Sequence, residues 1–105
     1  MEVIMAEQKK KLTKEQREQL TARRTQPWRM SIIEQLAKKP MTDVEVYDAT
    51  RPDRPDISKS KKVHNVASQL TYLKDDGYVV IRHEDKLVAI ADPEDNLYPG
   101  AEKYL

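Results

Sequence analysis

Residues 58–78, SKSKKVHNVASQLTYLKDDGY, decide how the rest of the chain is arranged. Their apolar side chains recur at helical spacing and would form one stripe along a helix. Because glycine readily adopts the left-handed backbone that ends helices, Gly77 predicts where this helix stops. The stripe predicted to face a core consists of Val63, Val66, Ala67, Leu70 and Leu73.

The opposite stripe of this predicted helix is polar. Such side chains contact phosphates and base edges in nucleic acids. Three lysines also crowd the first turn, where the helix dipole disfavours a cation unless an anion binds nearby. A solvated lysine face is the structural alternative, and the helix alone favours neither reading. The stripe consists of Lys61, Asn65, Ser68 and Tyr72, with Lys62, His64 and Gln69 on the flanks, and the lysines of the first turn are Lys59, Lys61 and Lys62.

Length and composition limit what the chain can do. With 105 residues and 38% hydrophobic content, it is expected to form one domain with a small core. The absence of cysteine excludes disulfides and thiolate metal ligands, and it fits a reducing, cytoplasmic location. The apolar run at residues 3–5 is too short for a secretory or membrane-spanning segment, so no membrane attachment is expected.

Charge is distributed unevenly although the net charge is only +1. Residues 9–29 contain eight basic and two acidic side chains, and residues 51–62 contain five and two. Residues 92–105 contain one basic and four acidic side chains. The chain therefore has two basic zones and an acidic tail, a polarity that bulk charge does not reveal.

The region before the core is predicted to be a separate helix over residues 13–24. Thr13 and Gln16 have the spacing of a capping box, but too few apolar residues follow to make a buried stripe. Either a basic arm along a DNA backbone or a solubilising terminal helix fits this pattern. Pro27 is expected to break the chain before the next helix.

Residues 28–39 have the pattern of a core helix, with Trp28 expected to cover the core at its start and Pro40 to end it. Thr42 and Glu45 form a second capping box, which opens a short helix to about residue 49. The expected inward residues are Met30, Ile32, Ile33, Leu36 and Ala37 of the first helix, and Val44 and Tyr47 of the second.

Residues 50–57 contain two prolines and are predicted to be extended. Arg51 and Arg54 in this connection are candidates for phosphate contacts. Pairing with the neighbouring Asp53 and Asp56 is the alternative, and it is slightly favoured.

Residues 78–82 and 86–90 are rich in β-branched residues and are predicted to form a hairpin. If Ile81 opposes Val88, Val79 opposes Ile90, and all four share one buried face. The loop over residues 83–85 lacks Asn-Gly, so a tip looser than a two-residue turn is expected.

The run NVASQLTYLKDDGYVVIRHEDKLVAI resembles the winged helix-turn-helix superfamily, especially MarR-type and ArsR-type regulators. Leu70, Leu73, Gly77 and Tyr78 occupy the places where the recognition helix of those families ends and the wing begins. The resemblance covers residues 28–91 and implies an α+β fold with a three-helix core, a β-hairpin wing and here an extra N-terminal helix. A homodimer built through the N-terminal helix or the tail is also implied.

By this resemblance, the helix over residues 58–76 would enter the major groove of double-stranded DNA, and the wing over residues 79–90 would touch the backbone or minor groove. The long, proline-rich connection and the acidic wing tip, Glu84 and Asp85, depart from the pattern. Wing contacts would therefore come from Arg82, His83 or Lys86. The expected DNA-binding set is Arg51, Arg54, Lys59, Lys61, Lys62, His64, Asn65, Ser68, Gln69, Arg82 and Lys86, with Asn65 and Gln69 reading bases.

Catalysis has little support in this sequence. The only histidines are His64 and His83, and no spacing matches a zinc site. With two glycines in the chain there is no phosphate-cradling loop. We therefore expect no enzyme activity, no metal and no cofactor.

The sequence is interpreted as a basic arm (residues 1–27), a winged-helix domain (28–91) and an acidic tail (92–105) that is disordered or extended. Leu97, Tyr98, Tyr104 and Leu105 could pack on a second subunit or back on the core. The expected function is sequence-specific DNA binding in transcription regulation. The alternatives are a winged-helix module that binds protein and an accessory protein of DNA replication or processing.

Overall fold

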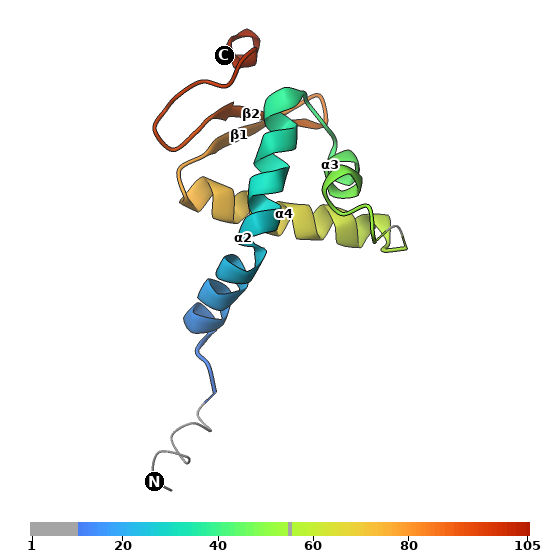
Figure 1. Ribbon diagram of the computed structural model, residues 1–105, viewed down its shortest axis with the longest axis vertical. Coiled ribbons are helices and arrows are strands. Elements are labelled where there is room, and N and C mark those ends of the chain that lie inside the picture. Colours follow the sequence, from blue (N-terminus) through green and yellow to red (C-terminus); the bar gives the residue numbers. More distant parts are fainter. Residues whose placement is uncertain (1–10, 55) are drawn as a thin grey trace, which may run out of the picture.

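The computed structural model describes residues 11–54 and 56–105. These residues form three α-helices and a two-stranded antiparallel hairpin, so the predicted α+β class is confirmed (Figure 1). The apolar run at residues 3–5 and the first two lysines of the predicted arm, at positions 9 and 10, lie outside the described residues. The elements are α2 (Lys14–Lys38), α3 (Asp43–Thr50), α4 (Lys59–Asp75), β1 (Val79–His83), β2 (Lys86–Ala91) and the short 3-10 helix η1 (Ala101–Tyr104).

Helix α2 runs without interruption through Pro27, so the predicted break there is wrong. A proline inside a helix lacks one N–H and crowds the preceding turn. Here that turn is held by side-chain donors, because Thr25 Oγ1 donates to the Thr21 carbonyl at 2.9 Å and Arg29 donates to the Ala22 carbonyl. The predicted capping box of Thr13 with Gln16 is confirmed at the start of this longer helix.

Only the second half of α2 packs against the rest of the chain. Its buried residues begin at Arg29 and continue with Ile32, Ile33 and Leu36. The first half projects away from the body, as Figure 1 shows in blue. Trp28, at the junction, packs on the core as predicted, and its ring meets Tyr47 edge-on with centroids 5.7 Å apart.

The capping box of Thr42 with Glu45 opens α3, as predicted. The carboxylate of Glu45 accepts a hydrogen bond from the Thr42 N–H, and this bond lowers the pKa of Glu45. Val46, not Val44, is the fully buried valine of this helix, together with Tyr47. These residues join Ile32, Leu36, Val66 and Leu73 in the main core.

Gly77 ends the α4 region as predicted, with φ of +103°. The Tyr78 N–H donates to the Leu73 carbonyl at 3.0 Å, which caps the helix and turns the chain into β1. A β-carbon at position 77 would lie 3.3 Å from Cβ of Pro93, so glycine is required by space as well as by backbone angle.

In the hairpin, Ile81 opposes Val88 as predicted, but Val79 opposes Ala91 instead of Ile90. A register irregularity between Val79 and Val80 shifts the pairing and leaves Val79 40% exposed. The tip is a tight two-residue turn, because Glu84 and Asp85 both adopt positive φ, at 49° and 65°. The expectation of a looser tip is therefore wrong.

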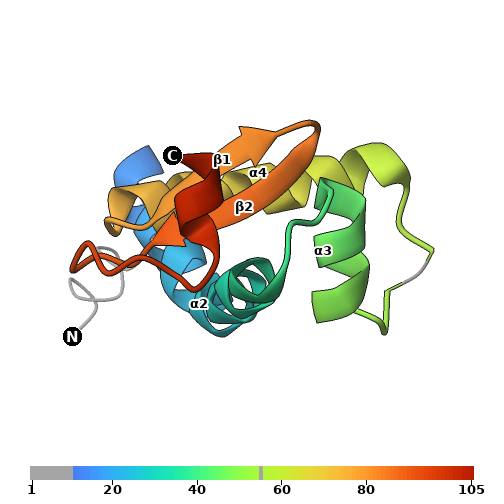
Figure 2. The same cartoon turned by 90° about the horizontal axis from the view of Figure 1, so that it is seen from above.

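The acidic tail folds back on the hairpin, so it is neither disordered nor an extended arm. Ala91 and Leu97 form a β-bridge, the Tyr98 N–H donates to the Ile90 carbonyl at 3.0 Å, and Ala101 is buried. Burial raises the pKa of Tyr98. Figure 2 shows η1 lying over β2 on the side away from the helices.

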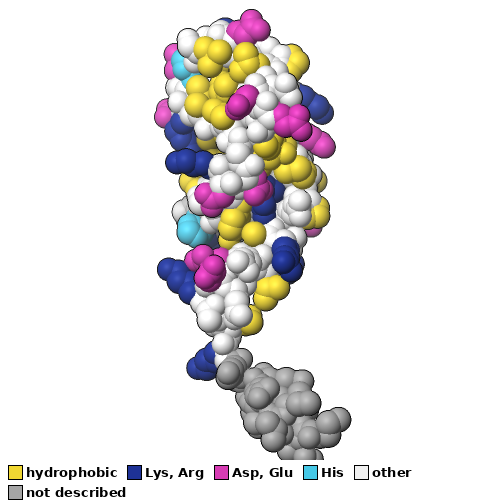
Figure 3. All heavy atoms as spheres, turned by 90° about the vertical axis from the view of Figure 1, so that its left-hand side faces the viewer, with side chains coloured by type: hydrophobic (Ala, Val, Ile, Leu, Met, Phe, Trp, Pro, Cys, Tyr) yellow, Lys and Arg dark blue, Asp and Glu magenta, His cyan; other side chains and the backbone are white. Residues whose placement is uncertain are grey.

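Both faces of β2 are consequently covered. Leu87 and Ala89 join the helical core, whereas Val88, Ile90 and Ala91 pack against Ala101 of the tail. The face that Ile81 and Val88 share is therefore buried by the tail and not by the helices. Hydrophobic side chains remain exposed between acidic ones around the end of the molecule where the tail turns (Figure 3). No helix in residues 11–54 and 56–105 is long and apolar enough to cross a membrane.

Candidate nucleic-acid interface

Helix α4 is rolled relative to its predicted orientation. Its buried residues are Lys62, Val66, Gln69 and Leu73, whereas Val63 and Ala67, predicted to face the core, are exposed. At about 100° per residue, the observed buried stripe is displaced by roughly 60° from the stripe that the apolar residues define. Two polar side chains have thus taken core-facing positions, and two apolar ones have lost them.

Lys62 is 8% exposed because its ammonium group has partners on α3. Its Nζ lies 2.7 Å from a carboxylate oxygen of Asp48, and 5.8 Å from the centroid of the Tyr47 ring. An ammonium group held in this way is not available to a DNA phosphate. The expectation that Lys62 lies exposed on the polar face of this helix is therefore wrong.

Gln69 is 3% exposed and accepts a hydrogen bond at its Oε1 from Arg29 Nε at 3.3 Å. Arg29 is itself buried and also pairs with Asp76 at 3.0 Å. Its guanidinium carbon lies 4.9 Å from the centroid of the Tyr72 ring. Gln69 therefore links α2 to α4, and the expectation that it lies exposed on the polar face of α4 is wrong.

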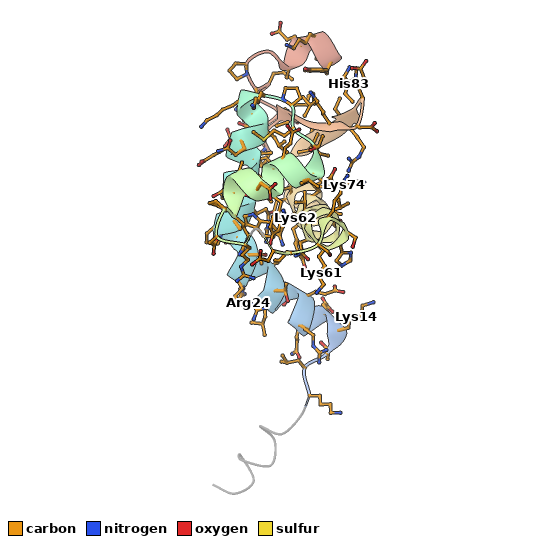
Figure 4. All side chains as sticks on the ribbon, turned by 90° about the vertical axis from the view of Figure 1, so that its right-hand side faces the viewer. Lys14, Arg24, Lys61, Lys62, Lys74 and His83 are labelled. Atoms are coloured by element: carbon orange, nitrogen blue, oxygen red, sulfur yellow. The ribbon has the colours of Figure 1, made fainter. Side chains whose placement is uncertain are left out.

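The exposed face of α4, which we call the α4 face, carries short polar side chains and lysines. Ser60, His64, Ala67 and Thr71 lie along its centre, and all four are exposed. Lys61 and Lys74 are exposed on its two flanks. Figure 4 places Lys61 and Lys74 on the same side of the molecule as Lys14 and His83, with Lys62 toward the middle.

Other predicted site residues of α4 keep access to this face. Lys59 and His64 are exposed, and Asn65 and Ser68 are half-buried along the edge that faces α2. The Ser68 hydroxyl donates to the His64 carbonyl at 3.2 Å, so its oxygen is left as an acceptor. From residue 57 to residue 74 the chain contains four lysines and no acidic residue.

The two arginines of the connection do not pair with the neighbouring aspartates, so the slightly favoured local pairing is wrong. No described carboxylate lies in salt-bridge range of Arg51 or Arg54. Arg51 instead stacks on Trp28, with its guanidinium carbon 4.2 Å from the ring centroid. Arg54 is exposed.

The hairpin offers less positive charge than its sequence predicts. Arg82 donates to both carboxylate oxygens of Asp43, at 2.7 and 3.3 Å, and this pairing raises the pKa of Arg82. The ring of His83 meets that of Tyr104, with centroids 5.1 Å apart. Of the three predicted wing contacts, Lys86 is the exposed cation without a salt bridge to another described residue.

A mainly apolar groove lies between the α4 face and the hairpin. It has a volume of about 440 Å³ and is lined by Leu70 and Lys74 of α4 and by Val79 and Ile81 of β1, among others. Among the described residues β1 pairs only with β2, so its other edge has unpaired backbone groups. Such an edge can accept an additional strand.

Sequence reasoning missed Ser60, Ala67, Thr71 and Lys74 as the exposed residues of α4. Nothing in the helical pattern marks them, because their exposure depends on Arg29 and Asp48 drawing Gln69 and Lys62 inward. The two partners lie 40 and 14 positions away in the chain. No family model, curated protein or solved structure matches this chain.

Proposed function

We propose that the chain is a winged helix-turn-helix protein that binds double-stranded DNA through the α4 face and regulates transcription. Three helices followed by an antiparallel hairpin support the fold. A further support is the bridge between Met41 and Leu87, in which each N–H donates to the other's carbonyl, at 3.1 and 2.6 Å. This bridge ties the turn between α2 and α3 to the wing.

The observation that carries the proposal is that all charged side chains of α4 before its last residue, Asp75, are lysines. The chain contains 18 acidic residues, yet residues 57–74 contain none. Lys59, Lys61 and Lys74 are exposed, and no carboxylate lies between them along the helix. A face of this kind is attracted to phosphates from either side of a groove.

In the proposed complex, α4 lies in the major groove with Ser60, His64 and Thr71 at its centre. Their hydroxyl and imidazole groups exchange hydrogen bonds with base edges, and the Ala67 methyl group contacts a thymine methyl. Lys59, Lys61 and Lys74 bind phosphates on the two sides, which fixes the register of the helix. Lys86 of the wing makes a backbone contact.

A salt series tests this function. Affinity for a mixed-sequence duplex should fall steeply between about 50 and 200 mM salt, because bound phosphates release counterions. Lys61→Ala should reduce the slope of log affinity against log salt by about 0.9, the share of one phosphate. Lys62→Ala is the matched control, because its ammonium group is already paired with Asp48.

Lys62→Ala should therefore leave the slope close to that of the unmodified chain after correction for any unfolded fraction. DNA binding through this face would be rejected if the chain bound no duplex at low salt. It would also be rejected if the unmodified chain, Lys61→Ala and Lys62→Ala all gave the same salt slope.

A second candidate function is protein binding, and the groove between α4 and β1 favours it. An extended peptide could pair with the unpaired edge of β1 and place apolar side chains against Leu70, Val79 and Ile81. Lys74 and Arg82, which also line the groove, would favour an acidic residue in that peptide.

Selection from a library of displayed peptides separates the two candidates. Peptides that bind the chain but not its Val79→Glu variant, together with no duplex binding at low salt, would establish the protein-binding function. Duplex binding that Val79→Glu leaves intact supports the DNA-binding function.

A further inference from the structure

A second hollow lies on the other flank of α4, between that helix, α2 and the end of α3. Its volume is about 280 Å³. The residues that matter here are Arg51, Arg54, Asn65 and Gln69, with Trp28 beneath Arg51, and no acidic residue lines the hollow. We call it the Arg51 hollow.

Arg51 is held in place by contacts on several sides. It caps the end of α3, where its N–H donates to the Tyr47 carbonyl at 2.7 Å. Its guanidinium group stacks on Trp28, whose Nε1 donates to Thr50 Oγ1 at 2.8 Å. Both the ring and the cation above it are therefore fixed before any ligand arrives.

The same arginine has unused hydrogen-bonding capacity. Its Nε atom is buried and has no hydrogen-bond partner among the described residues. No described carboxylate neutralises its charge. A buried donor without a partner is costly, so this position is one where a ligand oxygen would be favoured.

The neighbouring groups are also suited to donate. Arg54 is exposed on the rim, and the Asn65 side chain makes no hydrogen bond to another described residue. Because the Oε1 of Gln69 is engaged by Arg29, its amide NH₂ is the group left to bind a ligand. Two cations and two amides without a nearby carboxylate form a site for an oxyanion.

We infer that the Arg51 hollow binds a phosphate group. Its position beside the α4 face makes a backbone phosphate of bound DNA the expected source, and this part of the inference rests on the function proposed above. A phosphate-bearing small molecule would offer the same chemistry. The binding of free phosphate does not depend on DNA binding, so the two proposals can fail separately.

The chain contains a single tryptophan, Trp28, which reports directly on the site. Inorganic phosphate is titrated into the chain at constant ionic strength, with chloride replaced as phosphate is added. Tryptophan fluorescence and calorimetry follow binding. We expect a saturable change, lost in Arg51→Gln and weakened about tenfold or more in Arg54→Gln, as expected for losing a charge-assisted hydrogen bond.

Lys103→Gln on the tail is the matched control for loss of one positive charge and should bind phosphate normally. Arg54→Gln keeps the experiment decisive if Arg51→Gln unfolds, because Arg54 takes no part in the stacking on Trp28. The inference would be overturned if the unmodified chain gave no saturable response. It would also be overturned if both arginine variants bound phosphate as tightly as the unmodified chain.

The source of the phosphate follows from duplex binding. A backbone phosphate predicts that Arg54→Gln and Arg51→Gln each lower the salt slope by about 0.9. Lost phosphate binding with an unchanged slope would identify a small phosphate-bearing molecule as the occupant. If the chain binds no duplex, the phosphate titration alone decides the inference.

Discussion

Arg29 organises the polar contacts between α2 and α4. From one buried guanidinium group it donates to Gln69, to Asp76 and to the Ala22 carbonyl. The last contact lies in the turn before Pro27, and the first lies in the middle of α4. One side chain therefore supports the continuous helix α2 and also sets the roll of α4.

The first prediction concerns Gln69. Gln69→Ala should lower the free energy of unfolding by about 1–3 kcal/mol, because Arg29 Nε would lose its acceptor while remaining buried. Urea denaturation followed by circular dichroism measures the change. Asn65→Ala, four positions earlier and half-buried, is the control and should change stability by less than about 0.5 kcal/mol. Equal stability of the Gln69→Ala variant and the unmodified chain would contradict the assignment of Gln69 as a structural residue.

At this scale the sequence could predict only part of the site. Lys59, Lys61 and His64 are exposed as predicted, because the rotation of α4 about its own axis is too small to bury them. The positions of Lys62 and Gln69 could not be predicted. Periodicity counts polar side chains as outward, whereas a polar side chain with a fixed partner is stable inside.

At the scale of elements, α2 combines a packed half and an exposed half in one helix. Pro27 lies at their junction, close to where burial begins at Arg29. The sequence predicted both capping boxes, the end of α4 at Gly77 and the hairpin, since each depends on residues close together in the chain. The continuity of α2 was not predictable from local pattern, because the hydrogen bonds from Arg29 and Thr25 to carbonyls before the proline are visible only in the structure.

The second prediction follows from this continuity. Pro27→Ala should raise the free energy of unfolding, by up to about 3 kcal/mol, because alanine restores a helical N–H and removes the clash with the preceding turn. Thermal and urea denaturation measure the gain. If residues 24–28 were instead a break between two helices, the substitution would be neutral or destabilising.

The third prediction concerns the turn that carries the tail back to β2. The Asp92 carboxylate accepts hydrogen bonds from the N–H groups of Asn96 and Glu94, at 3.0 and 2.9 Å. These bonds, that of Asn96 first, lower the pKa of Asp92. A lowered pKa contributes stability that is complete above the unfolded pKa, about 3.9, and is lost as pH falls through the folded pKa.

Asp92→Asn should therefore be less stable than the unmodified chain at neutral pH, and the difference should shrink on acidification below about pH 4. Denaturation of both chains over a pH series measures it, and taking the difference cancels the other carboxylates, including Glu45. A difference that stays constant over the whole series would refute this role of Asp92.

At the scale of the whole molecule, the first half of α2 stands out because none of its residues is buried. An isolated helical segment of this length is marginal in water. Leu20 in this half is 48% exposed, and Leu12, just before the helix, is 49% exposed. The tail is less suited to self-association, because Tyr98, Ala101 and Tyr104 are already packed on its own chain.

The fourth prediction is accordingly a homodimer through α2. Sedimentation equilibrium should give twice the chain mass at micromolar concentration, and Leu20→Glu should reduce it to the monomer mass. Leu97→Glu on the tail is the control, with a similarly exposed leucine, and should remain dimeric. A monomer mass for the unmodified chain at every concentration would exclude this assembly.

The most direct test of DNA binding through the α4 face is chemical-shift mapping of the isotope-labelled chain with a short duplex. The largest shifts should fall on Ser60, Lys61, His64, Ala67 and Thr71, with small shifts at Val79 and Ile81 in the groove. Shifts confined to the groove and the edge of β1, or none in α4 at saturating duplex, would contradict the proposed interface.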